Sequence, residues 1–172
     1  VGPSLGEDSI RSGLFSVGLA TLLTILFMIL YYRTGGIVAD VAVVFCLILV
    51  LAVLAAFKGT LTLPGIAGII LTLAVAVDAN VLIYERIREE QATGKTLRAA
   101  IDAGYEKAFT AIFDSNLTTF ITGVILFQFG TGPVQGFALT LMIGIAASMF
   151  SAIYITRVIF NILTDKSGST VS

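Results

Sequence analysis

The sequence predicts an all-α membrane protein, a polytopic bundle of five transmembrane helices with one short cytoplasmic amphipathic helix. Hydrophobic residues make up 57% of the 172 residues, charged residues only 12%, and the mean hydropathy is +1.01. Soluble domains carry about 25% charged residues. Several apolar runs approach ~20 residues, the length of helix that crosses ~30 Å of hydrocarbon. The runs are continuous and do not alternate as membrane β-strands do.

Each run is bounded by a recognisable signal. Gly35-Gly36 is expected to end the first helix, next to interfacial Tyr32. A tight turn is expected from Lys58 to Thr60, and Pro64 suits a first helical turn, where a missing N–H costs nothing. Gly130 to Pro133 predicts another turn. The expected organisation is a periplasmic junction at 1–13, a membrane domain at 14–163 with spans at 14–32, 37–57, 63–84, 117–129 and 136–159, a cytoplasmic loop at 85–116 and a cytoplasmic tail at 164–172.

The loop contains the predicted amphipathic helix, at about Leu97–Phe113. Its apolar residues recur every three to four positions and form one face. We expect this helix to lie along the membrane surface. The residues of the face are Leu97, Ile101, Tyr105, Ala108 and Ile112.

Basic residues predict the orientation. With five spans, eight Lys and Arg residues fall on one side of the membrane and two, Arg11 and Lys58, on the other. Because cytoplasmic loops carry the excess of positive charge, the C-terminus is predicted to be cytoplasmic and the start of the chain to lie outside. The eight are Arg33, Arg86, Arg88, Lys95, Arg98, Lys107, Arg157 and Lys166.

Asp78 is the most informative residue, because it lies inside the apolar run 63–84. A carboxylate in hydrocarbon costs roughly 2.5–3.5 kcal/mol on insertion scales. Every basic residue lies in a loop or at the end of a run, so none is available at the same depth. Such an acid is kept neutral, takes up and releases a proton, or pairs with a cation from another subunit. The sequence therefore indicates transport or energy coupling across a membrane.

Three further polar residues lie near Asp78 in the sequence. Glu85 lies two helical turns beyond Asp78 on the same face, and with Arg86 it begins the charged stretch that leaves the membrane. Asp78 is therefore expected to be buried, roughly 10 Å from this exit. Asn80 points about 200° away from Asp78. It either forms a hydrogen bond between helices or contributes to the polar site.

Three polar residues near helix starts have two interpretations each. Asp114 and Asn116 open the fourth run, where Asp or Ser would cap the free N–H groups of the helix. The alternative is a part in a polar pathway with Asp78. Asp40, near the start of the second run, presents the same choice.

The fifth run carries small residues every four positions. Such residues let two helix backbones approach closely, so this ladder predicts a flat helix–helix contact. The face either packs the bundle only or also slides when the bundle changes state. The ladder consists of Gly136, Thr140, Gly144, Ser148 and Ala152.

Several functions receive no support from the sequence. Histidine is absent, and the one cysteine, Cys46, lies in an apolar run, so neither a metal site nor an internal disulfide is expected. No catalytic triad and no Gly-rich loop ending in Lys-Ser or Lys-Thr occurs, so we expect neither an enzyme nor an ATPase. With a net charge of −1 and no basic stretch, nucleic acid is not an expected partner.

Four segments of the chain resemble the SecD/SecF family of bacterial protein-export membrane proteins, in its SecD branch. They cover nearly the whole chain, and the opening Val1–Gly6 resembles the junction at which the family's periplasmic domain re-enters the membrane. The segments are Leu63-Pro-Gly-Ile-Ala-Gly68, Val77-Asp-Ala-Asn-Val-Leu-Ile-Tyr-Glu-Arg-Ile-Arg-Glu-Glu90, Asp114-Ser-Asn-Leu-Thr-Thr119 and Gly130-Thr-Gly-Pro-Val-Gln-Gly-Phe-Ala138.

The resemblance implies an architecture similar to resistance–nodulation–division transporters, in which a first helix and a large periplasmic domain precede five helices. It implies a place in the bacterial inner (plasma) membrane, and as partners SecF (separate or fused), the SecYEG channel, the preprotein that meets the periplasmic domain, and the lipid bilayer. It also implies use of the proton-motive force to assist preprotein translocation and release. Asp78 matches the family's proton-carrying acid, SecF supplies a further acid and a basic residue, and no cofactor besides protons is implied.

Two alternatives remain open from the residues alone. A proton-coupled exporter of small molecules in the same superfamily would also need Asp78, together with a substrate path through a periplasmic domain. A structural membrane scaffold would use Asp78 only for a hydrogen bond between helices.

Overall fold

The computed structural model describes residues 3–56 and 63–168 of the chain, and within these ranges it is helical with no strand. The predicted all-α membrane bundle is confirmed. Five stretches are long and apolar enough to cross a membrane, the fifth being formed jointly by the last three elements. The elements are α1 (Pro3–Tyr32), α2 (Thr34–Ala56), α3 (Leu63–Ala92), α4 (Leu97–Phe129), α5 (Pro133–Phe150), the π-helix η1 (Ser151–Ile155) and α6 (Thr156–Gly168).

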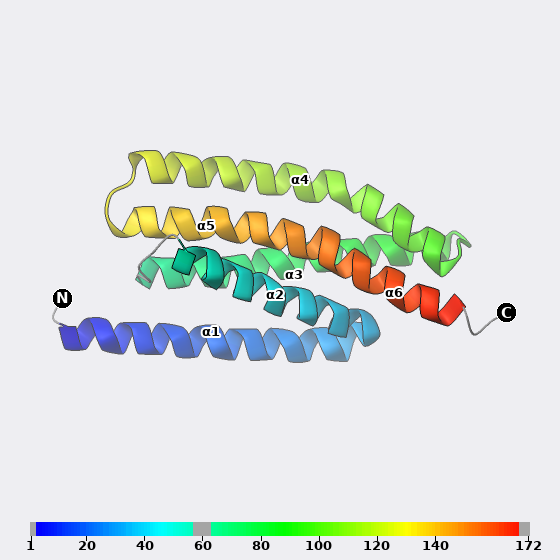
Figure 1. The fold of residues 1–172 in the computed structure, drawn as a ribbon, viewed down its shortest axis with the longest axis horizontal. Helices are drawn as coiled ribbons and strands as arrows, with labels where there is room; N and C mark the ends of the chain where they lie inside the picture. The colour runs from blue at the N-terminus through cyan, green and yellow to red at the C-terminus, as the bar shows by residue number, and fades with distance from the viewer. Residues whose placement is uncertain (1–2, 57–62, 169–172) are drawn as a thin grey trace.

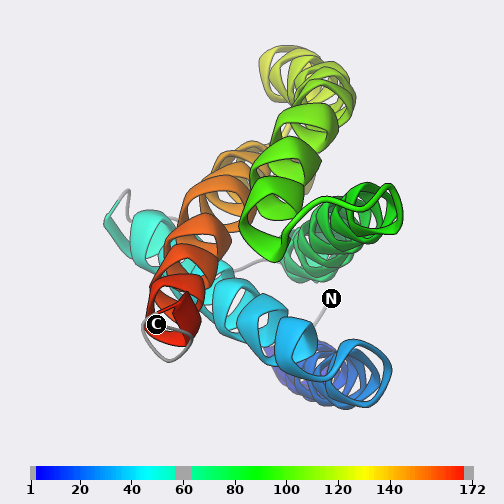
Figure 2. The same cartoon turned by 90° about the vertical axis from the view of Figure 1, so that its right-hand side faces the viewer.

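The helices run roughly along one axis (Figure 1). The α1–α2 and α3–α4 connections and the end of α6 lie at one end, and the starts of α1 and α3 and the α4–α5 turn lie at the other. Seen along the axis, α3 has α4 on one side and α1 on the other (Figure 2). The most extensive contact in the molecule joins α3 to α5. Helix α3 is therefore packed on one side and open on the other.

The connection between α1 and α2 corrects the first predicted break. The chain turns at Arg33, whose φ is 54°, and not at the glycine pair, which lies inside α2. Gly36 instead allows α1 and α2 to approach closely, because a Cβ on it would lie 1.9 Å from the Met28 carbonyl oxygen. The predicted turn at Lys58 to Thr60 lies outside the described residues.

Helix α4 corrects a second prediction. The expected short helix 97–113 and the expected span 117–129 are one continuous helix of 33 residues, which begins after the N-cap Thr96. At 1.5 Å per residue it is about 50 Å long, more than the ~30 Å of hydrocarbon. No Gly or Pro interrupts residues 105–122, so nothing ends the helix between the two halves. Its buried apolar residues pack into the bundle core and do not form a separate helix on the membrane surface.

The small-residue ladder of α5 lies against α3. Gly144 approaches so closely that a Cβ there would lie 1.9 Å from Thr72 Oγ1, and a Cβ on Gly68 would lie 3.1 Å from Thr140. Thr140 and Ser148 are buried, Gly136 is half-buried, and Ala152 is buried within η1. The predicted single fifth helix is thus interrupted by the π-helix. The α3–α5 contact, called the seam below, consists of Gly68 and Thr72 against Thr140 and Gly144.

The two other predicted turn signals agree with the structure. Pro64 lies in the first turn of α3. Gly130 ends α4, and Gly132, with a φ of 55°, precedes Pro133 at the start of α5. Cys46 is buried and free.

Candidate functional site

Asp78 lies near the middle of α3, on the side of this helix that the chain leaves open. Its neighbours Ala79 and Asn80 are buried, whereas Asp78 itself is exposed. The expectation that this chain buries Asp78 is therefore wrong. The reason is geometric, because α5 and the rest of the bundle cover the opposite side of α3.

A notch with polar and apolar walls adjoins Asp78 between α3 and α4. It has a volume of about 140 Å³, and α4 contributes Ser115, Asn116 and Thr119 to its polar lining. Apart from Asp78, the rest of its wall is apolar. Asn116 is 5% exposed and therefore directed into the contact between the helices. A carboxyl, an amide and two hydroxyls can bind and orient water, so the notch suits proton transfer to or from Asp78.

A second hollow borders Asp78 on the α1 side. It measures about 320 Å³, and its wall is apolar apart from Thr24 and Asp78. The Thr24 hydroxyl donates a hydrogen bond of 2.8 Å to the Ala20 carbonyl of its own helix. The surroundings of Asp78 are therefore polar toward α4 and apolar toward α1.

No cation of the described residues pairs with Asp78, and no hydrogen bond to its side chain is found within them. The ion pairs lie elsewhere, most of them at the ends of α3 and α4 next to the α3–α4 loop. They join Arg86 to Glu89, Arg88 to Glu85, Lys95 and Lys107 to Glu90, and Arg157 to Asp102.

Glu85 and Arg86 do not join the site. The Tyr32 hydroxyl donates a 3.1 Å hydrogen bond to Glu85, and Arg88 lies 3.4 Å from the same oxygen. Arg86 pairs with Glu89 at 2.9 Å, and both side chains of this pair are exposed. These groups neutralise one another where α3 continues past its apolar run.

The structure separates the two polar residues predicted to open the fourth span. Asn116 lines the notch, whereas Asp114 is exposed on α4 and does not. The capping role predicted for Asp114 is wrong, because it lies 17 residues inside a helix that starts at Leu97. Its backbone carbonyl accepts a 3.0 Å hydrogen bond from the Thr118 hydroxyl.

Asn80 and Asp40 lie inside the bundle, away from Asp78. Asn80 donates a 3.0 Å hydrogen bond to Ala76 of its own helix, so the expected bond between helices is not formed by its amide nitrogen. Asp40 is 8% exposed, on α2. It lies beyond the first turn of α2, which begins at Thr34, and therefore does not cap that helix.

Sequence reasoning missed two features. Ser115 and Thr119 become notch residues only once α4 is known to be continuous, since their spacing of four then puts them on one face. Glu90 is also buried, beyond the apolar run of α3, and pairs with Lys107 and Lys95. The hydrogen bonds and charges of these two lysines lower the pKa of the Glu90 carboxyl. Nothing in the sequence distinguishes Glu90 from the exposed Glu89 beside it.

Comparisons with known proteins identify the family of this chain. The family described as "Protein export membrane protein SecD/SecF, C-terminal" matches residues 1–166. The protein translocase subunits SecD of Rhodothermus marinus and Syntrophobacter fumaroxidans are 71% and 61% identical over the whole chain. The chain spans only 28% and 32% of their lengths.

Solved structures show the same fold. The crystal structure of SecDF, a translocon-associated membrane protein from Thermus thermophilus, matches with a TM-score of 0.92 and 42% identity, over 96% of this chain and 23% of that one. A structure of SecDF in a super-membrane-facing form matches with a TM-score of 0.89 and 43% identity over the same shares. This chain therefore belongs to the SecD/SecF family of protein-export membrane proteins, as a C-terminal membrane portion of the SecD type.

Proposed function

We propose that this chain is the transmembrane part of an accessory subunit of the Sec translocase that uses the proton-motive force, with Asp78 as the proton-carrying group. The observation that carries the proposal is an acid at mid-helix, beside the notch, with no counter-charge among the described residues. In a membrane such an acid binds a proton or meets a cation from a second polypeptide.

The open side of α3 is where the second polypeptide would lie. A SecF partner, fused or separate, would cover Asp78 there and supply the cation that this chain lacks. SecDF of Thermus thermophilus is translocon-associated, which supports the SecYEG channel and the preprotein as further partners. Loops rich in Lys and Arg are typically cytoplasmic, which supports an inner-membrane orientation with the α3–α4 loop inside and the start of α1 outside.

The mechanism couples the charge of Asp78 to helix packing. A proton enters from outside along the hydrated notch and neutralises Asp78, and the helices repack along their small-residue faces. The movement passes through the start of α1 to a periplasmic domain, which biases the preprotein outward, and release of the proton to the cytoplasm resets the bundle. One proton crossing 100 mV supplies about 2.3 kcal/mol. That energy shifts a two-state equilibrium by roughly fiftyfold.

In the test, the substitution Asp78→Asn is made in the full-length protein, assembled with its partner in the membrane. The substitution removes the titrating carboxyl group and keeps the size of the side chain. Preprotein translocation is measured with and without a proton gradient. We expect the gradient-dependent part to be lost and the gradient-independent part to remain. Asp102→Asn, an exposed acid on α4, is the matched control and should retain both parts. Normal gradient-driven translocation by Asp78→Asn would refute the proton-carrying role.

A further inference from the structure

A second polar cluster lies inside the bundle, on the packed side of α3 and away from Asp78. It consists of buried side chains on α2, on α3 and at the junction of α5 with η1. Within the described part of the chain, six of their buried oxygen atoms have no hydrogen-bond partner. These are both carboxylate oxygens of Asp40, Asn80 Oδ1, Tyr84 Oη, Ser148 Oγ and Ser151 Oγ.

The packing places Asn80 and Ser151 at one level of the bundle. Thr72 contacts Gly144, and α3 and α5 run side by side in the same direction, so Asn80 lies level with the turn that contains Ser151. The Tyr84 hydroxyl, one turn beyond Asn80, lies within electrostatic reach of the Asp40 carboxyl. On α2, the Cys46 thiol lies beside the Ser151 hydroxyl.

Asp40 has no charged neighbour among the described residues. Helix α1 presents Ile25 and Ile29 to it, and α3 presents Tyr84. The α5–η1 side contributes only hydroxyls to the cluster, and no charged side chain acts on the Asp40 carboxyl. An isolated carboxylate in such a setting is far more costly than the neutral acid, which can also donate a hydrogen bond.

The backbone departs from regular α-helix at the same level. Ser151 begins the π-helix η1, and single π-turns inside α-helices are frequent at functional sites. Beyond it, Thr156 hydrogen-bonds both Tyr105 and the Ala152 carbonyl, so the departure is held by specific contacts. The irregular turn and the unpaired oxygens are two independent observations of the same place.

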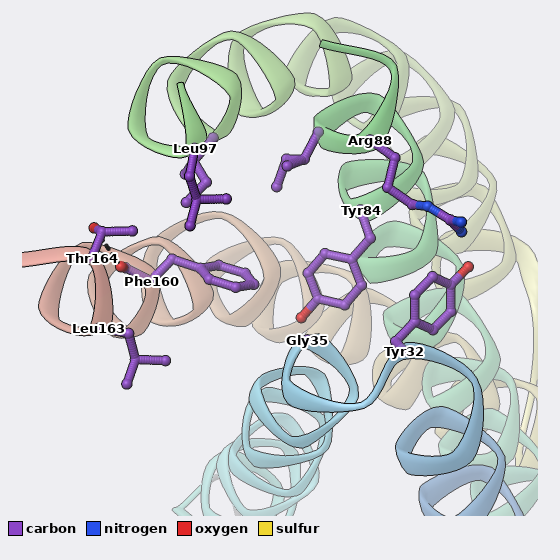
Figure 3. Close-up of a pocket in the computed structure, with 10 residues that line it drawn as sticks. Tyr32, Gly35, Tyr84, Arg88, Leu97, Phe160, Leu163 and Thr164 are labelled. Carbon is purple, nitrogen blue, oxygen red and sulfur yellow. Dashed lines mark hydrogen bonds between the residues drawn. The ribbon is translucent and has the colours of Figure 1, made fainter. Parts of the chain in front are cut away.

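A cavity reaches toward the cluster from the end of the bundle that holds the α3–α4 loop. It has a volume of about 310 Å³ and lies between the starts of α2 and α4, the end of α3 and α6 (Figure 3). The Tyr84 ring lines the cavity, 3.8 Å from the position of a Cβ on Gly35, while its hydroxyl is buried. Tyr84 is therefore shared by the cavity and the cluster.

We propose that Asp40, Asn80, Tyr84, Ser148 and Ser151 form an internal hydrated site that binds a proton on Asp40. Water completes the hydrogen bonds of the amide and the hydroxyls, as buried water does in other proteins. The site is separate from Asp78, and the Tyr84 cavity is its route to the loop end of the bundle. A role in coupling rests on the proposed function, whereas the existence of the proton-binding site does not.

The first experiment detects the bound proton directly. The full-length protein with its partner, reconstituted in liposomes, is examined by infrared difference spectroscopy at neutral pH for the carbonyl band of a protonated carboxyl. We expect a component of this band that is present in the wild type, in Asp78→Asn and in the control Asp102→Asn, and that is lost in Asp40→Asn. A band unchanged by Asp40→Asn, no band at all, or a band removed by sodium or potassium at fixed pH would overturn the proposal.

A second measurement keeps the test valid if Asp40→Asn folds poorly. Asp40→Leu replaces the acid by an apolar side chain and should fold at least as well as the wild type, because a buried unpaired acid is removed. We expect proton-driven translocation to fall about tenfold in Asp40→Leu, within the range typical of coupling between sites. Lower thermal stability of Asp40→Leu together with an unchanged infrared band would contradict the site.

The two proposals fail separately. Normal translocation by Asp78→Asn refutes the proposed function and leaves the infrared band of Asp40 as predicted. Absence of the Asp40-dependent band refutes the internal site and leaves the loss of translocation in Asp78→Asn as predicted.

Discussion

Two acids within apolar runs of this chain, Asp78 and Asp40, lie in opposite surroundings. Asp78 is exposed on the open side of α3, beside hydroxyls and an amide of α4. Asp40 is 8% exposed, inside the bundle, and neither carboxylate oxygen has a partner in the described ranges. The first acid therefore depends on something outside this chain. We infer that the second is satisfied within it, by a proton and water.

The two sides of α3 differ in their packing as well. The packed side meets α5 through glycine and threonine residues at backbone contact distance. Such a seam leaves no room for added atoms, and its geometry is fixed by this chain alone. The open side carries larger exposed residues such as Leu71, together with Asp78. Stability should thus depend mainly on the packed side and coupling mainly on the open side.

The largest effect is expected from adding a side chain to the seam. Gly144→Leu would place a Cβ 1.9 Å from Thr72 Oγ1, so α3 and α5 would have to separate. Overpacking of this kind typically costs 1–3 kcal/mol, and we expect a loss of about 3 kcal/mol in the free energy of unfolding. Thermal unfolding of the purified chain in detergent, followed by circular dichroism, measures it.

Gly18→Leu is the matched control, at an open position on α1. Nothing lies within 4 Å of a Cβ at Gly18 on α1. Because leucine favours helix more than glycine does, by roughly 1 kcal/mol, stability should stay equal or rise. Equal losses in the two variants would contradict the distinction between the packed and the open sides.

A smaller effect is expected from Glu90→Gln, at the loop end of the packed side. Lys107 and Lys95 lower the pKa of Glu90 below its ordinary 4.5. Because the pKa of Glu90 is lower in the folded chain, the unfolded chain binds the proton more readily. The stabilisation of the fold by ionised Glu90 is therefore complete above about pH 4.5 and is lost as the pH falls through the lowered pKa. The wild type should lose stability on acidification more steeply than Glu90→Gln. Parallel slopes between pH 5 and 3 would refute the assignment.

Much of the fold could be predicted because it depends on composition and local signals. The apolar runs, the turn at Gly130 to Pro133 and the close packing of the ladder at Gly144 all act through the nearest residues of the chain. The errors arose where a local signal had two physical uses. Gly36 could either break a helix or allow a neighbouring backbone to approach closely. Asp114 could either cap a helix or lie in its middle.

The site was harder to predict because it depends on which side of each helix is covered. Periodicity puts Asp78 and Asn80 on different faces of α3 but does not say which face meets α5. Only the packing shows that Asn80 faces inward and that Ser115 and Thr119 accompany Asn116 beside Asp78. The unpaired oxygens of Asp40 likewise follow from tertiary contacts alone.

The smallest effect is expected from Arg86→Gln, and it sharpens the contrast between the two acids. Arg86 is the basic residue nearest in sequence to Asp78, yet it pairs with exposed Glu89. Exposed pairs contribute at most about 1 kcal/mol and often nothing measurable, so stability should change by less than about 0.5 kcal/mol. Proton-driven translocation should also remain, because the counter-charge of Asp78 is expected from a second polypeptide. If Arg86→Gln abolished translocation as Asp78→Asn is expected to do, the counter-charge would belong to this chain, and the open side of α3 would not need a cation from elsewhere.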